Sequence, residues 1–241
     1  MGMRLDRLLS ELSPKMSRKQ CRDAIRAGRV SVDGAAVRDP ERKTDPEAET
    51  VALDGIAFSY ARFRYFLLNK PAGVLSASRD KKQKTVLDLI PGIDPEKYFP
   101  VGRLDIDTEG FLLITNDGAL AHELLSPKKH VPKTYHAVCR GVLTEEDCAK
   151  LSAGIDLGDF VTAPAKAGIL LKGDTETVLF LTITEGKFHQ VKRMVQAVGS
   201  EVTALRRVSM GGLSLPDDLP AGHYTELTTA EIARIRISEE N

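Results

Sequence analysis

Hydrophobic side chains near the start of the chain recur at helical spacing. Four leucines at i, i+3, i+4 and i+7 predict an amphipathic helix over Leu5–Leu12. A second helix begins after Ser17, a residue type that caps helices, and ends at Gly28. A short hairpin then turns at Asp33-Gly34. The first segment is therefore predicted to be a small module of two helices and a hairpin.

The pattern changes after a polar stretch over residues 38–50, which contains two prolines, and a short strand at Val51–Gly55. Beyond a linker near residues 57–64, alternating and continuous hydrophobic runs predict strands at Tyr65–Asn69, Phe111–Thr115, Thr134–Cys139 and Val178–Thr184, and helices at Ala119–Leu125, Thr144–Ala153 and His189–Val198. Strands and helices do not alternate regularly, so we expect an α+β fold with a mixed, largely antiparallel sheet and flanking helices. The predicted domains are residues 1–58 and 62–241.

The composition of the chain excludes several classes of protein. The chain has 241 residues, of which 42% are hydrophobic and 28% charged, which is enough to bury a core and excludes wholesale disorder. No apolar run approaches the roughly 20 residues that span a bilayer. The first residues are charged from Arg4 onward and do not resemble a signal peptide. Cys21, Cys139 and Cys148 lack paired spacing, so we expect free thiols and a cytoplasmic location.

The formal net charge is zero, which by itself argues against a polyanionic partner. The charge is not uniform, however. Residues 1–43 hold 11 Lys and Arg against 6 Asp and Glu, and residues 60–140 hold 13 against 9. The excess of acids lies in residues 44–59 and 141–241. Since local fields govern binding to a polyanion, we expect one basic surface and an acidic back, and RNA is not excluded.

The second predicted helix carries a row of arginines. Arg18, Arg22 and Arg26 are four positions apart and share one face, and Arg29 follows the helix. A row of this kind is commonly a solvated helix face. In a short basic module it also fits an RNA-binding surface, and both interpretations remain open from the spacing alone.

A cluster of acids precedes the predicted strand at Phe111–Thr115. Asp105, Asp107, Glu109 and Gly110 match the first positions of a calcium loop, but Asn116 stands where that loop has a bidentate glutamate. Asp105 and Asp107 also match a glycosidase carboxylate pair. The chain has no tryptophan and only 5% aromatic residues, so platforms for sugar stacking are scarce. From spacing alone, a polar turn before a strand is favoured.

Two cationic residues lie in the first turns of the predicted helix that begins near His189. Lys192 and Arg193 oppose the helix dipole there, so we expect them to serve a nearby carboxylate or phosphate. Tyr135, between basic residues, is either a half-buried core residue or a ring that stacks on a base. The histidines have no metal-ligand spacing.

Taken together, these segments resemble a pseudouridine synthase of the RsuA family. The matching stretches are NKPAGV (69–74), VGRLDIDTEGFLLITNDG (101–118), KTYHA (133–137), ITEGKFHQVKRMVQAVG (183–199) and LRRVSMGG (205–212). The first module resembles the alpha-L RNA-binding motif of a small-subunit ribosomal protein. The resemblance covers nearly the whole chain, in the order of the family.

This resemblance implies a mixed antiparallel sheet with a cleft across it, and conversion of a uridine in RNA to pseudouridine without cofactor or metal. Asp105 would be the catalytic carboxylate, Tyr135 would stack on the uracil, and Lys192 would pair with Asp105 and keep it ionised. Asp107 would organise the turn. RNA contacts are expected from Arg103, Arg193 and Arg207, and from Arg18, Arg22, Arg26 and Arg29 in the first module.

The tail is short and ends near the acidic pair Glu239-Glu240, whereas family members that act on the large subunit often carry a long basic extension. The resemblance therefore implies a monomeric, membrane-free enzyme acting on uridine 516 of 16S rRNA, either naked or in an assembling small subunit. A 23S rRNA enzyme of the same family is the alternative. A non-catalytic rRNA-binding assembly factor is the alternative from another class.

Overall fold

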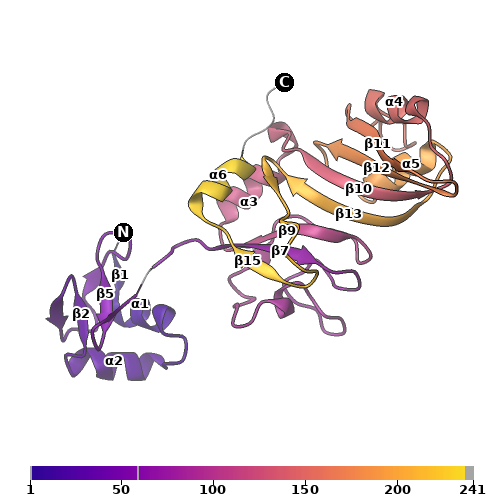
Figure 1. Ribbon diagram of the computed structural model, residues 1–241. Helices are drawn as coiled ribbons and strands as arrows, with labels where there is room; N and C mark the ends of the chain where they lie inside the picture. Colours follow the sequence, from indigo (N-terminus) through magenta and orange to yellow (C-terminus); the bar gives the residue numbers. More distant parts are fainter. Residues whose placement is uncertain (1, 59, 237–241) are drawn as a thin grey trace. The chain divides into compact units, whose positions relative to one another are not determined.

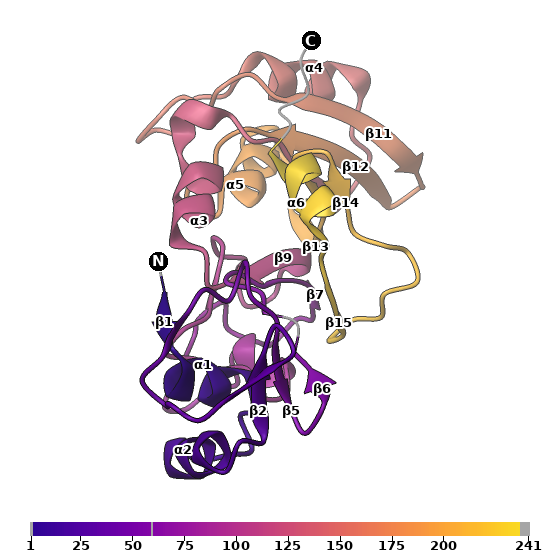
Figure 2. The ribbon, with the colours of Figure 1, turned by 90° about the vertical axis from the view of Figure 1, so that its left-hand side faces the viewer.

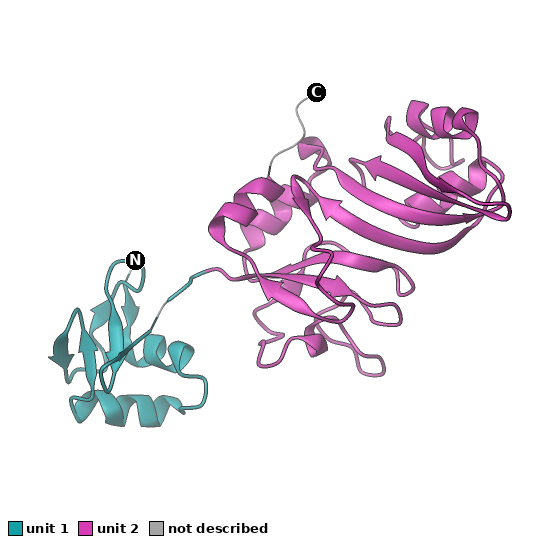
Figure 3. Ribbon diagram, in the orientation of Figure 1, with its two compact units in different colours: residues 1–62 teal, residues 63–241 magenta. Residues whose placement is uncertain are grey.

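The computed structural model describes residues 2–58 and 60–236, and the acidic pair Glu239-Glu240 lies outside the described residues. The chain divides into two compact units, residues 1–62 and residues 63–241 (Figure 3). Each unit has a hydrophobic core of its own. Within the described residues, no helix is long and apolar enough to cross a membrane.

The first unit contains two helices, a four-stranded sheet in the order β3-β2-β5-β6 and a separate β1-β4 pair. Its elements are β1 (Met3–Arg4), α1 (Leu5–Leu12), α2 (Arg18–Arg26), β2 (Val30–Val32), β3 (Ala35–Val37), β4 (Lys43–Thr44), β5 (Val51–Leu53) and β6 (Ile56–Ala57). Ser17 caps α2 through a capping box with Gln20, which explains why the helix begins there. Figure 2 shows α1 and α2 side by side, and their leucine and isoleucine side chains pack on the valines of the sheet.

The second unit is built on a nine-stranded sheet, whose main path runs β11-β12-β10-β13-β9-β7-β15. Its strands are β7 (Tyr65–Lys70), β8 (Phe99–Pro100), β9 (Glu109–Thr115), β10 (Lys133–Arg140), β11 (Lys166–Lys172), β12 (Glu176–Ile183), β13 (Val202–Met210), β14 (Leu213–Ser214) and β15 (Tyr224–Glu226). Within the described residues, all pairings are antiparallel except that of β9 with β13. The predicted α+β fold with a mixed, largely antiparallel sheet is confirmed.

Helices cover both faces of this sheet. They are α3 (Gly118–Leu125), α4 (Glu145–Ala153), α5 (Gln190–Ala197) and α6 (Thr229–Ile235), with short 3-10 turns at Leu87–Leu89 and Pro127–Lys129. Figure 1 shows α4 and α5 toward the β11-β12 end of the sheet, and α3 and α6 toward the other end.

The strand β9 explains why the middle of the sheet is buried on both sides. Along β9, Leu112 and Ile114 join the core beneath α4 and α5, whereas Phe111 and Leu113 join the core beneath α3 and α6. A strand buried on both faces needs a continuous hydrophobic run, and the sequence FLLI supplies it. The polar loop before β9 is thereby fixed at the edge of a rigid core.

Candidate active site

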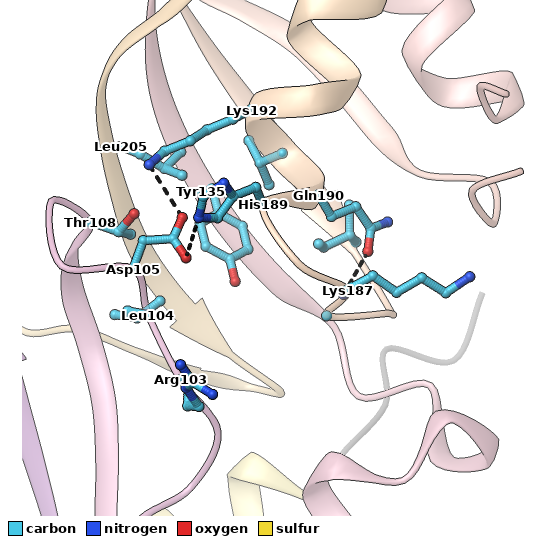
Figure 4. Close-up of a pocket in the computed structure, with 13 residues that line it drawn as sticks. Arg103, Leu104, Asp105, Thr108, Tyr135, Lys187, His189, Gln190, Lys192 and Leu205 are labelled. Atoms are coloured by element: carbon cyan, nitrogen blue, oxygen red, sulfur yellow. Dashed lines mark hydrogen bonds and ion pairs between the residues drawn. The ribbon is translucent and has the colours of Figure 1, made fainter. Parts of the chain in front are cut away.

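The three residues that sequence reasoning placed in catalysis lie around one cavity of the second unit (Figure 4). Asp105 comes from the loop before β9, Tyr135 from β10 and Lys192 from α5. The cavity holds about 60 Å³. A wider hollow of about 790 Å³ shares Asp105, Lys192 and His189 with it. The structure thus brings together residues that are up to 87 positions apart in the sequence, and their roles remain predictions.

The loop that carries Asp105 is held by a buried lysine. Lys70, the last residue of β7, has no exposed surface. Its Nζ lies 2.8 Å from the carbonyl oxygen of Thr108, 3.1 Å from that of Asp105 and 3.3 Å from that of Ile106. Burial lowers the pKa of Lys70 to about 8, against the opposing effect of the nearby acids. A strand residue therefore fixes the backbone that presents the carboxylate.

Ser76 fastens the same loop from another side. Its hydroxyl donates to the carbonyl oxygen of Leu104 at 2.9 Å and accepts from the Leu104 N–H at 3.1 Å. The N–H of Gly73 donates to the carbonyl oxygen of Ile106 at 2.7 Å. The segment around NKPAGV, one of the stretches that resemble the family, therefore supports the candidate catalytic loop.

Lys192 bridges two carboxylates. Its Nζ lies 3.2 Å from Asp105 Oδ2, and 2.7 and 2.9 Å from the two carboxylate oxygens of Asp107. Burial lowers the pKa of Lys192, but its bonds to Asp107 and Asp105 outweigh burial and raise it. The hydrogen bond from Lys192 lowers the pKa of Asp107. The predicted Lys192–Asp105 pair is present, and Asp107 is a second partner that sequence reasoning assigned only to the turn.

The pairing with Lys192 also bears on the calcium-loop interpretation. The carboxylates of Asp105 and Asp107, which would be the first ligands of such a loop, both bind the Lys192 ammonium. Within residues 2–58 and 60–236, no three His, Cys, Asp or Glu side chains are grouped as ligands of a metal ion. Both carboxylates of the loop are therefore engaged by a lysine ammonium.

His189 is a neighbour of Asp105 that the sequence pattern did not single out. Its Nε2 lies 3.5 Å from Asp105 Oδ1, and its backbone is left-handed, with φ of 49°. Tyr135 lies deeper, with 7% of its surface exposed, and lines the cavity beside Asp105 and His189 (Figure 4). Its burial agrees with both interpretations of the ring, since it belongs to the core and forms a wall of the cavity.

The arginines predicted to contact RNA in this unit lie in different settings. Arg103 is exposed and lines both the cavity and the hollow, so it is available to a ligand. Arg193 instead pairs with Asp159 and donates to the carbonyl oxygen of Leu157 at 2.9 Å. Arg193 thus serves a carboxylate, one of the two partners expected from its place in the helix, and it does not line the cavity.

The prediction that Arg207 contacts RNA is wrong. Only 3% of Arg207 is exposed, and its Nε donates to the carbonyl oxygen of Phe111 at 2.8 Å, across the β9-β13 pairing. A phosphate cannot reach a guanidinium that is enclosed in the sheet. Arg207 therefore joins two strands and has a structural position.

In the first unit, the arginine row converges on a buried acid. Asp6 of α1 has no exposed surface, and its carboxylate accepts from Arg22 Nε at 2.8 Å, Arg18 Nη2 at 3.3 Å and Arg4 Nη2 at 3.1 Å. Burial raises the pKa of Asp6, but these bonds outweigh burial and hold the pKa far below its usual range. Arg18 and Arg22 are therefore positioned by Asp6 and are not independent members of a solvated face.

The remaining predicted arginines of this unit lie nearby. Arg26 lines a shallow surface hollow together with Arg4, Arg18, Lys19 and Arg22. Arg29 donates to Asp54 Oδ1 at 2.9 Å, so its charge is partly balanced. Five cationic side chains and one acid, Asp23, line the hollow, so this face is basic.

Comparison with known proteins gives two family matches. Residues 64–197 match the RNA pseudouridylate synthase family, and residues 3–49 match the S4 domain. These ranges fall in the second and the first unit, respectively.

Similar proteins cover almost the whole chain. An uncharacterized RNA pseudouridine synthase of Bacillus subtilis is 49% identical over 95% of this chain and 97% of that protein. The ribosomal large subunit pseudouridine synthase B of the same organism is 40% identical, over 91% and 90%. The ribosomal small subunit pseudouridine synthase A of Escherichia coli is 38% identical, over 97% and 100%. A crystal structure of a pseudouridylate synthase is 33% identical, with a TM-score of 0.67 over 97% and 99%.

Proposed function

The chain belongs to the RsuA type of the RNA pseudouridylate synthase family, with an N-terminal S4 domain, and on that basis we propose that it converts a specific uridine of 16S rRNA to pseudouridine. The observation that carries the proposal is the ion pair between Asp105 and Lys192 beside the Tyr135 ring. Asp105 is the catalytic carboxylate in this proposal, Lys192 its partner and Tyr135 the ring under the uracil.

The reaction moves one bond of the nucleotide. The bond between uracil N1 and ribose C1′ breaks, the base turns, and a bond from C5 to C1′ forms, while a proton leaves C5 and N1 gains one. A carboxylate at the ribose stabilises or traps the oxocarbenium character of C1′. Asp105 is 28% exposed and lines both the cavity and the wider hollow, so its oxygens are available to a ribose while Lys192 holds them in place.

The target nucleotide must leave its stack to reach Asp105. Flipping costs a few kcal/mol and costs least in a loop or bulge. In this proposal the extruded uracil lies on Tyr135, and Arg103 contacts the backbone near the vacated position. The dimensions favour this assignment, because the cavity near Tyr135 holds about 60 Å³ and continues into a hollow large enough for a nucleotide.

Uridine 516 of 16S rRNA is the proposed target, either naked or in an assembling small subunit, with the enzyme acting as a cytoplasmic monomer. The relative from Escherichia coli, which is named for the small subunit, matches over its full length. The relative named for the large subunit is equally similar, at 40% identity, so a 23S uridine is the second candidate. The three cysteines are buried free thiols, in keeping with a reducing compartment.

The catalytic assignment is tested with D105N on unmodified 16S and 23S transcripts and on small-subunit particles, scored for pseudouridine. D107N, in the same loop, is the matched control. We expect D105N to lose at least about a thousandfold in rate and D107N to lose less than about tenfold, because only Asp105 is assigned to the ribose. A normal rate for D105N would remove Asp105 from the mechanism.

The target is tested by mapping pseudouridine in total rRNA from cells with and without the gene, and from cells that carry only the D105N gene. Loss of the 16S site alone is expected in both altered strains. Loss of a 23S site alone would reject the small-subunit target. If the D105N gene corrected every growth or assembly defect of the deletion, RNA binding without catalysis would be the main role.

A further inference from the structure

We propose that Phe188 and His189 form a stacking platform at the rim of the active site, which binds the nucleobase of an unpaired nucleotide next to the target uridine. This inference rests on the proposed function, since it names a second contact of the same RNA. It assigns to Phe188 a role that is separate from that of Tyr135.

The first observation is an exposed pair of stacked rings. Phe188 is 75% exposed, although large hydrophobic side chains of this unit are mostly buried. Its ring lies 3.8 Å from the imidazole of His189, centroid to centroid, at an angle of 18°. The imidazole thus covers part of the phenyl ring and leaves most of it in solvent. A flat, exposed aromatic surface of this kind suits a nucleobase, because every base has a π-face.

The second observation is that the platform is held in place. His189 adopts a left-handed backbone with φ of 49°, which costs energy for a residue with a side chain. Gln190, which is 3% exposed, fixes the segment on both sides of Phe188. Its Oε1 accepts from the Lys187 N–H at 3.1 Å and its Nε2 donates to Glu185 at 2.8 Å. The rings are therefore arranged before any ligand binds, which lowers the entropic cost of binding.

The third observation is the location. Phe188 lines the hollow of about 790 Å³, on which Asp105 and Arg103 also border, whereas Tyr135 lines only the smaller cavity. The two aromatic surfaces thus occupy different depths of one site. A uracil on Tyr135 leaves Phe188 for a neighbouring base, and the cationic Arg103 and Lys187 of the same hollow suit the phosphates between the two nucleotides.

The absence of tryptophan from the chain makes the inference directly measurable. F188W introduces a single indole at the rim, and the D105N background prevents turnover. L171W, on the exposed part of the edge strand β11, is the matched control, because Leu171 is 63% exposed and does not line the hollow. The probes are unmodified 16S and 23S rRNA transcripts.

When the transcript binds, we expect the indole of F188W to lose at least about half of its emission through stacking, and that of L171W to change little. F188A is expected to bind RNA about tenfold more weakly, with its deficit restored by F188Y. Filter binding of D105N and pseudouridine formation by the wild type are measured alongside. If RNA binds and reacts but the F188W emission and the F188A affinity are unchanged, the platform is refuted and the proposed function stands. If neither transcript binds nor reacts, the proposed function fails, and the platform with it.

Discussion

The ammonium group of Lys70 lies 3.1 Å from the main-chain carbonyl oxygen of Asp105, although 35 positions separate the two residues. The side chain of Lys70, at the end of a buried strand, thus holds the main chain that carries the candidate catalytic carboxylate. Lys70 also reaches the carbonyl oxygens of Ile106 and Thr108, so one side chain holds three carbonyl groups of the turn.

We expect K70M to destabilise the second unit and to slow the reaction. The substitution removes the Lys70 donor from the carbonyl oxygen of Thr108, whereas the carbonyl oxygens of Asp105 and Ile106 keep the N–H groups of Thr108 and Gly73. An unsatisfied buried carbonyl costs about 1–3 kcal/mol, so a loss of that size in the free energy of unfolding is expected. Urea unfolding and kcat report the two effects. K97M is the control, because Lys97 is an exposed partner of Asp94 and its removal is expected to change neither. If K70M is as stable as the wild type, the loop that carries Asp105 does not depend on Lys70 for its conformation.

The bridge at Lys192 predicts unequal effects for its two acids. K192M is expected to lower kcat about a hundredfold, because two adjacent carboxylates then lose their common counter-ion. D107N is expected to lower it less than about tenfold, since Lys192 remains 3.2 Å from Asp105. Single-turnover rates at saturating enzyme measure both effects. A larger loss for D107N than for K192M would transfer the main role to Asp107.

Asp6 predicts an acid-sensitive first unit. Its pKa in the folded chain lies below the usual value of 3.8, so its stabilising effect is complete above pH 3.8 and is lost as the pH falls through and below that value. Native amide NMR signals of α1 and α2 in mild urea measure this loss in the full chain. D6N is expected to be about 2 kcal/mol less stable at pH 7 and to lack this pH dependence. Parallel pH curves for D6N and the wild type would contradict the prediction.

The basic face of α2 predicts a salt-dependent contribution to RNA binding. Replacing Arg18, Arg22 and Arg26 with alanine is expected to weaken binding and to reduce the log–log salt slope by about 0.7–0.9 for each RNA phosphate that the variant no longer neutralises. R26A is the cleanest single change, because R18A and R22A also remove partners of Asp6. R7A, on α1 and paired with Glu11, is the control. If the salt slope of the triple variant is unchanged, these arginines do not contact RNA phosphates.

The sequence predicted the helices and strands whose hydrophobic residues recur regularly, and missed strands that lack such a pattern. The helix Leu5–Leu12 and the strands at β7, β9 and β10 follow clear hydrophobic patterns. The edge strand β11 has exposed leucines instead of alternation, because only one neighbouring strand covers it. The strand β13 has two arginines at its centre, and one of them is buried. That buried arginine is Arg207, which the resemblance had assigned to RNA.

The three candidate catalytic residues were predicted, but the residues that hold them in place were not. Asp105, Tyr135 and Lys192 came from a resemblance to a family, and the structure places them together. The contacts of Lys70 and His189 depend on how distant segments meet, which no local pattern encodes. The lysine at the end of the buried strand β7 is the one available hint, because lysine is rarely buried without partners.

The junction of β9 and β13 has a consequence for how activity arises during folding. Two residue pairs join these strands, and Arg207 bonds across them to a residue 96 positions away. Asp105 belongs to the half-sheet on one side of this seam, and Tyr135 and Lys192 belong to the segments on the other. Neither half contains the site, and closing so long a loop comes late and slowly. We therefore expect catalytic activity to appear only after the β9-β13 pairing has formed.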